Sequence, residues 1–337
     1  MPATVWFRRI NLVAVVACFV LVVVGAYVRL SDAGLGCPDW PGCYGQIVVP
    51  TASQAAVSDH AAYAIQPLVA PKAWKEMIHR YLAGFVGLLV VGLALGAFRL
   101  RGAGAPMRLA LTVLGVIGVQ IVFGALTVTW KVMPIIVTTH LLLGLTTLAL
   151  LWWMWLRQSP CALRAVDVRP GIRGWAALAL GVVALQIFLG GWTSTNYAAV
   201  ACPDFPTCQA SYGLQTALGP AFDLWHGLGI NYEGGILAAS VRATIHMVHR
   251  YGALLTTLIV GGLGLYLVAR GRGRGLRGLG VACIVVLLLQ LAIGIGFVEM
   301  RFPLSLADAH TGGAALLLLT VVSLNHFVWS AQCATEA

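Results

Sequence analysis

The chain has 337 residues, of which 60% are hydrophobic and 9% are charged, and its formal net charge is +10. Apolar runs of membrane-spanning length recur along it, which excludes a soluble globular protein. The positive charges are scattered over the short segments between these runs. Because they form no basic module that could read a groove, we expect no nucleic-acid partner and interpret the charges as topology signals.

The apolar runs predict an all-α membrane protein with eight transmembrane helices, because backbone groups in lipid must be satisfied within helices and these runs are too long for barrel strands. The predicted spans cover residues 10–30, 76–98, 109–129, 135–156, 174–195, 243–268, 278–298 and 305–330. The first span could imitate a signal peptide, but its apolar run is long and no small-residue cleavage pattern follows, so we expect a retained helix. No amphipathic transit peptide precedes it, which favours a bacterial plasma (inner) membrane over an organelle.

The basic residues predict the orientation of the spans, since Lys and Arg accumulate in cytoplasmic loops. Most of them lie at one set of helix ends: Arg8, Arg9, Arg99, Arg101, Arg108, Arg157, Arg164, Arg169, Arg173, Arg270, Arg272, Arg274 and Arg277. We therefore expect both termini in the cytoplasm and the long loops that follow the first and fifth spans on the outer, periplasmic side.

Two cysteine pairs lie in these outer loops, within the segments CPDWPGC and CPDFPTC. The outer side is oxidising, and proline bends each short loop, so we predict that Cys37 bonds to Cys43 and Cys202 to Cys208. A zinc site made by all four cysteines is the alternative, although its usual cysteine spacing is shorter. The remaining cysteines lie within spans or on the reducing side and are expected to be unpaired: Cys18, Cys161, Cys283 and Cys333.

The chain also matches itself, which predicts two similar halves, residues 1–160 and 161–337. The two cysteine segments are related by an offset of 165 residues, which also pairs Gly25 with Gly190. Further on, MIHRYLAG matches MVHRYGAL and QIVFG matches QLAIG at an offset of 170. Each half holds an even number of spans, so we predict a parallel repeat of two four-helix bundles with equivalent sites on the same membrane side.

Four histidines recur in this repeat near the outer ends of spans: His79 and His140 in the first half, His249 and His310 in the second. Within each half the two are 61 residues apart. A lone membrane histidine is more often a packing residue, but two per half at one depth favour bis-histidine ligation of a haem iron in each bundle.

Charged residues beside the ligand candidates suggest further roles. Arg80 and Arg250 follow the histidines directly and would either pair with haem propionates or reach to lipid headgroups. Glu76 lies one turn before His79, and the second half has His246 there instead. A carboxylate in one half only assigns the chemistry to that half.

Two alternatives compete with these roles. The carboxylate of Glu76 could instead form a surface ion pair with Lys72 or Lys75. His246 and His249 could form a metal pair, but two ligands are a weak signal.

The segments GAYVRLSDAGLGCPDWPGCYGQ, EMIHRYLAG, QIVFGALTV, TTHLLLGL, CPDFPTC, HMVHRYGA and DAHTGGA together resemble the haem A synthase family over essentially the whole chain. The resemblance implies oxidation of the C8 methyl group of haem O to a formyl group, by successive hydroxylations to a hydrate that loses water. The product, haem A, is used by cytochrome oxidases.

The resemblance also implies a division of roles between the halves. Glu76, His79 and His140 would serve the substrate haem, and His249 and His310 would ligate a resident haem b. A haem O synthase and an electron donor are the implied partners, but no residue identifies contact with either. The sequence leaves the electron donor, the oxygen source, redox activity of the disulfides and a homo-oligomer open.

Two other function classes stay open: a bis-histidine di-haem electron carrier of the quinol-linked cytochrome b type, and a haem carrier without oxidation chemistry. A parallel repeat argues against the transmembrane electron carrier, because both haems would lie near one surface. His60 and His226 lie in outer loops and His326 near the inner end of the last span. We assign no role to these three.

Overall fold

A computed structural model describes residues 2–56, 66–158, 170–271 and 273–330. Within these ranges the chain is helical, without a strand, and eight helices are long and apolar enough to cross a membrane. This confirms the predicted all-helical membrane class and the number of spans. His60, Cys161, Cys333 and the boundary expected between residues 160 and 161 lie outside the described residues.

The long helices of the first part of the chain are α1 (Pro2–Leu30), α4 (Ala70–Arg99), α5 (Met107–Thr129) and α6 (Pro134–Arg157). Those of the second part are α7 (Pro170–Thr195), α9 (Ala239–Thr256), α10 (Gly262–Arg270), α11 (Gly273–Glu299) and α12 (Leu304–Ser330). A π-helical turn at Thr257–Gly261 joins α9 to α10, so the predicted sixth span is one long helix with this turn inside it. The short helices α2 (Ala52–Ala56) and α8 (Leu218–Ala221) belong to the long loops.

The helix that follows the first long loop begins earlier than its hydropathy predicts. Proline occupies the first turn of α4, where its missing N–H costs nothing and its fixed φ favours helix. The expected start at Glu76 marked only the apolar part of the helix. Glu76 therefore lies inside a helix that continues beyond the apolar run, within reach of the loop.

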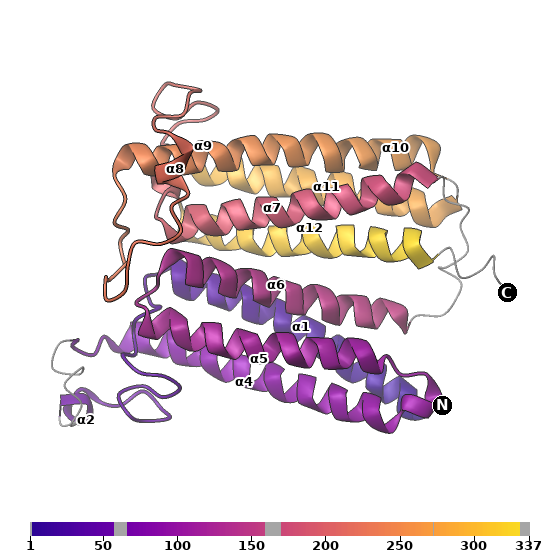
Figure 1. Ribbon diagram of the computed structural model, residues 1–337, viewed down its shortest axis with the longest axis horizontal. Helices are drawn as coiled ribbons and strands as arrows, with labels where there is room; N and C mark the ends of the chain where they lie inside the picture. The colour runs from indigo at the N-terminus through magenta and orange to yellow at the C-terminus, as the bar shows by residue number, and fades with distance from the viewer. Residues whose placement is uncertain (1, 57–65, 159–169, 272, 331–337) are drawn as a thin grey trace.

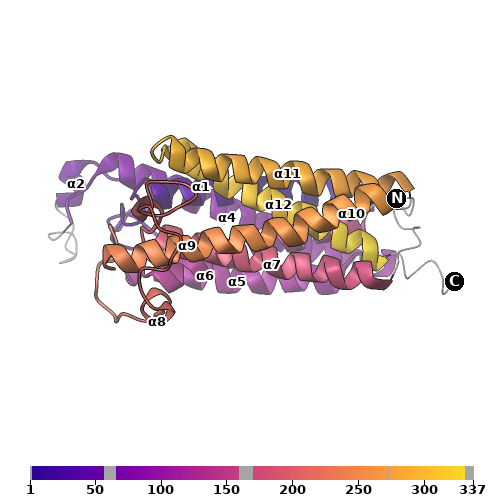
Figure 2. The ribbon, with the colours of Figure 1, turned by 90° about the horizontal axis from the view of Figure 1, so that it is seen from above.

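The helices run side by side along the long axis of the molecule (Figures 1 and 2). In Figure 1, α1, α4, α5 and α6 form the lower group, and α7, α9, α10, α11 and α12 form the upper group. Helices α1 and α6 pack against α12, and α6 also packs against α7, so these contacts join the two groups. The loops carrying α2 and α8 lie at one end, whereas α1 begins and α12 ends at the opposite end (Figure 1).

Polar contacts also join the two groups at the loop end. The Arg29 guanidinium donates to the Ser194 carbonyl at 2.6 Å, and the Tyr197 hydroxyl donates to Asp32 at 2.6 Å. Burial is the larger cause of a raised pKa for Tyr197, and its hydrogen bond to Asp32 acts in the same direction. The neutral phenol is thus retained as a donor across the contact between the groups.

Candidate functional site

The four predicted histidines come from four different helices at the loop end of the bundle. In the first half, His79 lies on α4 and His140 on α6. His249 lies on α9 and His310 on α12, with ring centroids 6.4 Å apart and ring planes at 80°. The structure therefore brings His249 and His310 together within the second half of the chain, and the pairing of His79 with His140 stays a prediction.

The separation of His249 and His310 tests whether this pair suits a haem iron. With a metal–nitrogen bond of about 2 Å, and roughly 1 Å from that nitrogen to the ring centre, two axial imidazoles on one iron have centroids about 6 Å apart. The observed 6.4 Å fits this arrangement. In addition, the Nδ1 atoms of His79, His140 and His310 are buried without a hydrogen-bond partner in the described part of the chain.

A glycine on a neighbouring helix lies against each of the four imidazoles. A Cβ atom built on Gly25 would lie 2.7 Å from Cε1 of His79, and one on Gly294 would lie 2.7 Å from Cε1 of His310. The same construction gives 3.2 Å from Gly124 to His140 and from Gly190 to His249. A side chain at any of these four glycines would therefore enter the space that the facing imidazole occupies. Glycine at these positions lets the neighbouring helix pack closely against the ring.

Glu76 is a buried acid of the first half, with 4% of its surface exposed. Its Oε2 accepts a hydrogen bond from the Cys37 backbone N–H at 2.8 Å, and its Oε1 pairs with Nη2 of Arg80 at 2.5 Å. These charge-assisted contacts compensate the burial of the carboxylate.

The two lysines considered for Glu76 have other partners. Lys72 pairs with Glu233 at 3.0 Å, and Nζ of Lys75 lies 4.9 Å from the centre of the Tyr27 ring. The alternative of a surface ion pair between Glu76 and either lysine is therefore wrong.

The two arginines that follow the histidines bind the disulfide loops. Nη1 of Arg80 donates to the carbonyls of Pro41 and Gly42, the first at 3.2 Å. Nη1 of Arg250 donates to the carbonyls of Pro206 at 3.2 Å and Thr207 at 2.5 Å. Each guanidinium thus holds its loop over the histidine end of the bundle, and a role toward haem propionates stays a prediction.

Both predicted disulfides form, Cys37 with Cys43 and Cys202 with Cys208. Cys18 and Cys283 are free and buried within helices, as expected.

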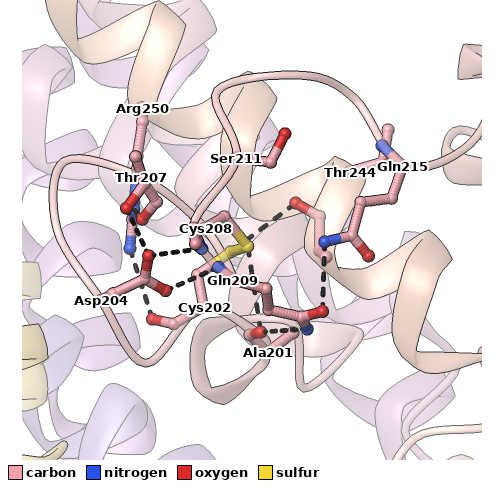
Figure 3. The surroundings of a disulfide bond; sticks show 12 residues. Ala201, Cys202, Asp204, Thr207, Cys208, Gln209, Ser211, Gln215, Thr244 and Arg250 are labelled. Carbon is pink, nitrogen blue, oxygen red and sulfur yellow. Dashed lines mark hydrogen bonds between the residues drawn. A yellow bond between two sulfur atoms is a disulfide. The ribbon is translucent and has the colours of Figure 1, made fainter.

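Figure 3 shows the second loop, in which Asp204 accepts hydrogen bonds from the Thr207 hydroxyl and from the N–H groups of Gln209 and Ala210. The Thr207 contact is the largest cause that lowers the pKa of Asp204 to about 2, and the backbone donors add to it. Asp39 accepts from the N–H groups of Tyr44 and Gly45 in the first loop. An aspartate therefore closes the turn of each disulfide loop.

The other described histidines have different surroundings. His246 is buried, with 5% of its surface exposed, and no group of three or more His, Cys, Asp or Glu residues that could hold a metal occurs in the described ranges. His226 lies 3.6 Å from Asp223 in the loop before α9, and the ring of His326 packs edge-on against Trp153.

Three glutamines to which the sequence patterns give no role contact the histidines of the two halves. Nε2 of Gln120 lies 3.4 Å from Nε2 of His140, and the amides of Gln186 and Gln290 reach His249 and His310. The repeated motifs QIVFG and QLAIG contain Gln120 and Gln290, together with the glycines behind the rings. That repetition was the available signal, whereas Gln186 lies in a segment without a matching glutamine.

Known proteins match the chain along its length. The COX15-CtaA family model, described as cytochrome oxidase assembly protein, matches residues 8–322. The chain is 41% identical to heme A synthase of Shewanella oneidensis over 332 residues, which cover 98% of both proteins. It is 30% identical to heme A synthase of Caulobacter sp. (strain K31) over 351 residues, which cover 97% of this chain and 95% of the relative.

A shorter match, 30% identical over 148 residues, covers 44% of this chain and 27% of protoheme IX farnesyltransferase 1 of Natronomonas pharaonis. The family model and the full-length relatives confirm the resemblance that the sequence motifs indicated. The chain belongs to the COX15-CtaA family of cytochrome oxidase assembly proteins.

Proposed function

We propose that this protein is a haem A synthase of a bacterial inner membrane, which oxidises the C8 methyl group of haem O to a formyl group. Its length-wide similarity to heme A synthases supports this function. The observation that carries the proposal is the buried carboxylate of Glu76, one helical turn before His79, at a position where the second half has His246. Because only the first half has an acid at this position, the two sites are suited to different roles, one for a reacting haem and one for a retained haem.

The proposed substrate site is formed by His79 and His140, with Glu76 beside them. When bound there, the haem iron supplies the redox chemistry. The chain supplies the position of the substrate through the two imidazoles and a proton-accepting group through Glu76. Because Cys37 and Arg80 hold both carboxylate oxygens, Glu76 is fixed before the substrate arrives.

The proposed resident site holds haem b between His249 and His310. The 6.4 Å separation of their ring centroids supports this assignment. Arg80 and Arg250 would serve the haems indirectly, by holding the disulfide loops over the two sites, or directly through the propionates.

We further propose that the two halves, residues 1–160 and 161–337, are parallel repeats with both termini in the cytoplasm. The arrangement that supports this has both disulfide loops at one end of the bundle and the ends of α1 and α12 at the other (Figure 1). The disulfides favour the oxidising periplasm for their end, and the haem sites would then lie near the outer face.

The proposed partners follow from the reaction. Haem O is the substrate, and a farnesylating haem O synthase would provide it. The partial similarity to protoheme IX farnesyltransferase 1 supports a relationship with such an enzyme. The oxidation also requires an electron acceptor or donor system outside the two histidine pairs.

Extraction of haem from the purified protein tests this function. The protein is co-expressed with a source of haem O, and the extracted haems are separated and identified by mass. Haem A in the extract supports the synthase. Haem B alone, bound with a bis-histidine spectrum despite ample haem O, would instead identify an electron carrier, and unchanged haem O would identify a haem carrier.

A further inference from the structure

The amide of Gln186 on α7 holds His249 at two points. Its Nε2 lies 3.1 Å from Nδ1 of the imidazole and also donates to the backbone carbonyl of His249 at 3.1 Å. One side chain thus fixes both the ring and the helix turn that carries it. Nε2 of the ring makes no hydrogen bond with the described residues and remains available to a metal.

Gln290 on α11 also bridges the ring and the backbone of His310, but it contacts the other ring nitrogen. Its Nε2 lies 3.3 Å from Nε2 of His310 and donates to the carbonyl of that residue at 3.0 Å. The other ring nitrogen, Nδ1, is buried and has no partner among the described residues. Both histidines of the second half are therefore bridged from a neighbouring helix by an amide.

Room for each amide comes from a glycine three residues after the histidine. A Cβ atom at Gly252 would collide with Oε1 of Gln186, and a Cβ atom at Gly313 would collide with Oε1 of Gln290. The glutamine and the glycine thus form a matched pair on facing helices. We call the two sets Gln186–His249–Gly252 and Gln290–His310–Gly313 the amide clamps.

The first half lacks both clamps. At the repeat offset of 165 residues Leu21 takes the place of Gln186, and at the offset of 170 Leu82 and Leu143 take the places of Gly252 and Gly313. Gln120 is kept, but in the described structure it reaches only the ring of His140, at 3.4 Å, and not its carbonyl.

We propose that Gln186 and Gln290 are positioning residues that make the second half retain its haem. Because the first half lacks the two amide clamps, it can exchange substrate for product. The inference rests on the proposed function, which places a resident haem in one half and a reacting haem in the other. A group that orients a metal-bound histidine changes metal affinity by about 10- to 100-fold. A substrate site benefits from weaker haem binding, because tight retention would slow product release.

A purely structural role for the glutamines predicts a different result. If the amides only satisfy the carbonyls of His249 and His310, their loss would lower the yield of folded protein without changing how fast the bound haem leaves. Haem release and the spectrum of the bound haem therefore separate the two roles, independently of haem A formation.

The experiment follows transfer of haem b from the purified, detergent-solubilised protein to excess apomyoglobin by absorbance. We expect Gln186→Leu and Gln290→Leu each to speed the transfer by about 10- to 100-fold and to alter the low-spin electron paramagnetic resonance signal. Gln120→Leu is the matched control, with unchanged transfer from the second half. Transfer within twofold of wild type in both second-half variants, with an unaltered signal, would overturn the inference and leave the proposed function standing.

The reverse exchange keeps the inference testable when the leucine variants do not fold. Leu21→Gln combined with Leu82→Gly installs a clamp on His79, and we expect slower release of haem from the first half. Unchanged release from a folded double variant contradicts the inference. If His249→Ala binds the same haems in the same amounts as the wild type, the proposed resident site is wrong, and this inference falls with it.

Discussion

The carboxylate of Glu76 accepts a hydrogen bond from the backbone N–H of Cys37, with 2.8 Å between Oε2 and the nitrogen. Glu76 belongs to helix α4, and Cys37 begins the loop that its own disulfide closes. The position of the acid therefore depends on the conformation of the loop. Arg80 strengthens this dependence, because its guanidinium binds both Glu76 and the loop carbonyls.

Removing the first disulfide should displace the acid without emptying the second half. We expect Cys37→Ala with Cys43→Ala to lower haem A formation by about 10- to 100-fold, since a displacement of about 1 Å can cost this much in catalysis. The measurement is the haem A content of membranes at matched protein levels. The control is Cys202→Ala with Cys208→Ala in the second half, where His246 stands at the position equivalent to Glu76. An equal loss in both variants would argue against the coupling.

Replacing a histidine of the first half and a histidine of the second half should have different effects on the bound haem and on haem A formation. We expect His249→Ala to remove the bis-histidine spectrum of the purified protein, because the resident haem loses an axial ligand. His79→Ala should keep that spectrum and abolish haem A formation. Absorbance spectra of both variants, purified in parallel, make the comparison. Loss of the resident spectrum in His79→Ala alone would reverse the proposed assignment of the halves.

Gly25, which packs against the imidazole of His79, should tolerate no side chain. A methyl group at Gly25 would lie 2.7 Å from the His79 ring, so Gly25→Ala should push the imidazole away and cost about 1–3 kcal/mol of packing. We expect a lower content of haem O and haem A, with the resident haem kept. Gly87→Ala on the same helix as His79 meets nothing within 4 Å and is the control. Equal haem contents in the two variants would show that the close approach has no functional role.

The second disulfide loop should be protected by an ionised aspartate over a wide pH range. The pKa of Asp204 is lowered to about 2, first through the Thr207 hydroxyl, so the unfolded loop takes up a proton before the folded loop does. The stabilisation is then complete above the ordinary pKa of aspartate and is lost as the pH falls toward 2. Reduction of Cys202–Cys208 by a phosphine should be faster in Asp204→Asn than in wild type at pH 7, with the ratio approaching one near pH 2. A ratio of one at pH 7 would contradict this role.

Hydropathy, the cysteine spacing and the recurring histidine motifs were sufficient to predict much of this fold. The number of spans, both disulfides and the pairing of His249 with His310 follow from patterns that recur at long range in the sequence. The early start of α4 did not follow, because its first turn is not apolar and extends beyond the run that hydropathy detects.

Contacts between segments far apart in the chain were beyond the reach of sequence reasoning. Glu76 accepts a hydrogen bond from Cys37, which lies in a loop 39 residues away, whereas its ion-pair partner Arg80 follows it by four residues on the same helix. The bridge from Gln186 to His249 also depends on the room that Gly252 leaves on a facing helix. Spacing along one helix carries no information about such a pair.

Haem analysis of membranes that co-express this protein with a haem O source separates the role of Glu76 from that of another carboxylate, when wild type, Glu76→Ala and Glu233→Ala are compared. Glu233 is the control, since it is a carboxylate at the same end of the molecule and pairs with Lys72 outside the histidine sites. We predict haem A with wild type and Glu233→Ala, and bound haem O and haem b without haem A in Glu76→Ala. Haem A at the wild-type level in Glu76→Ala would contradict the assignment of the chemistry to this acid.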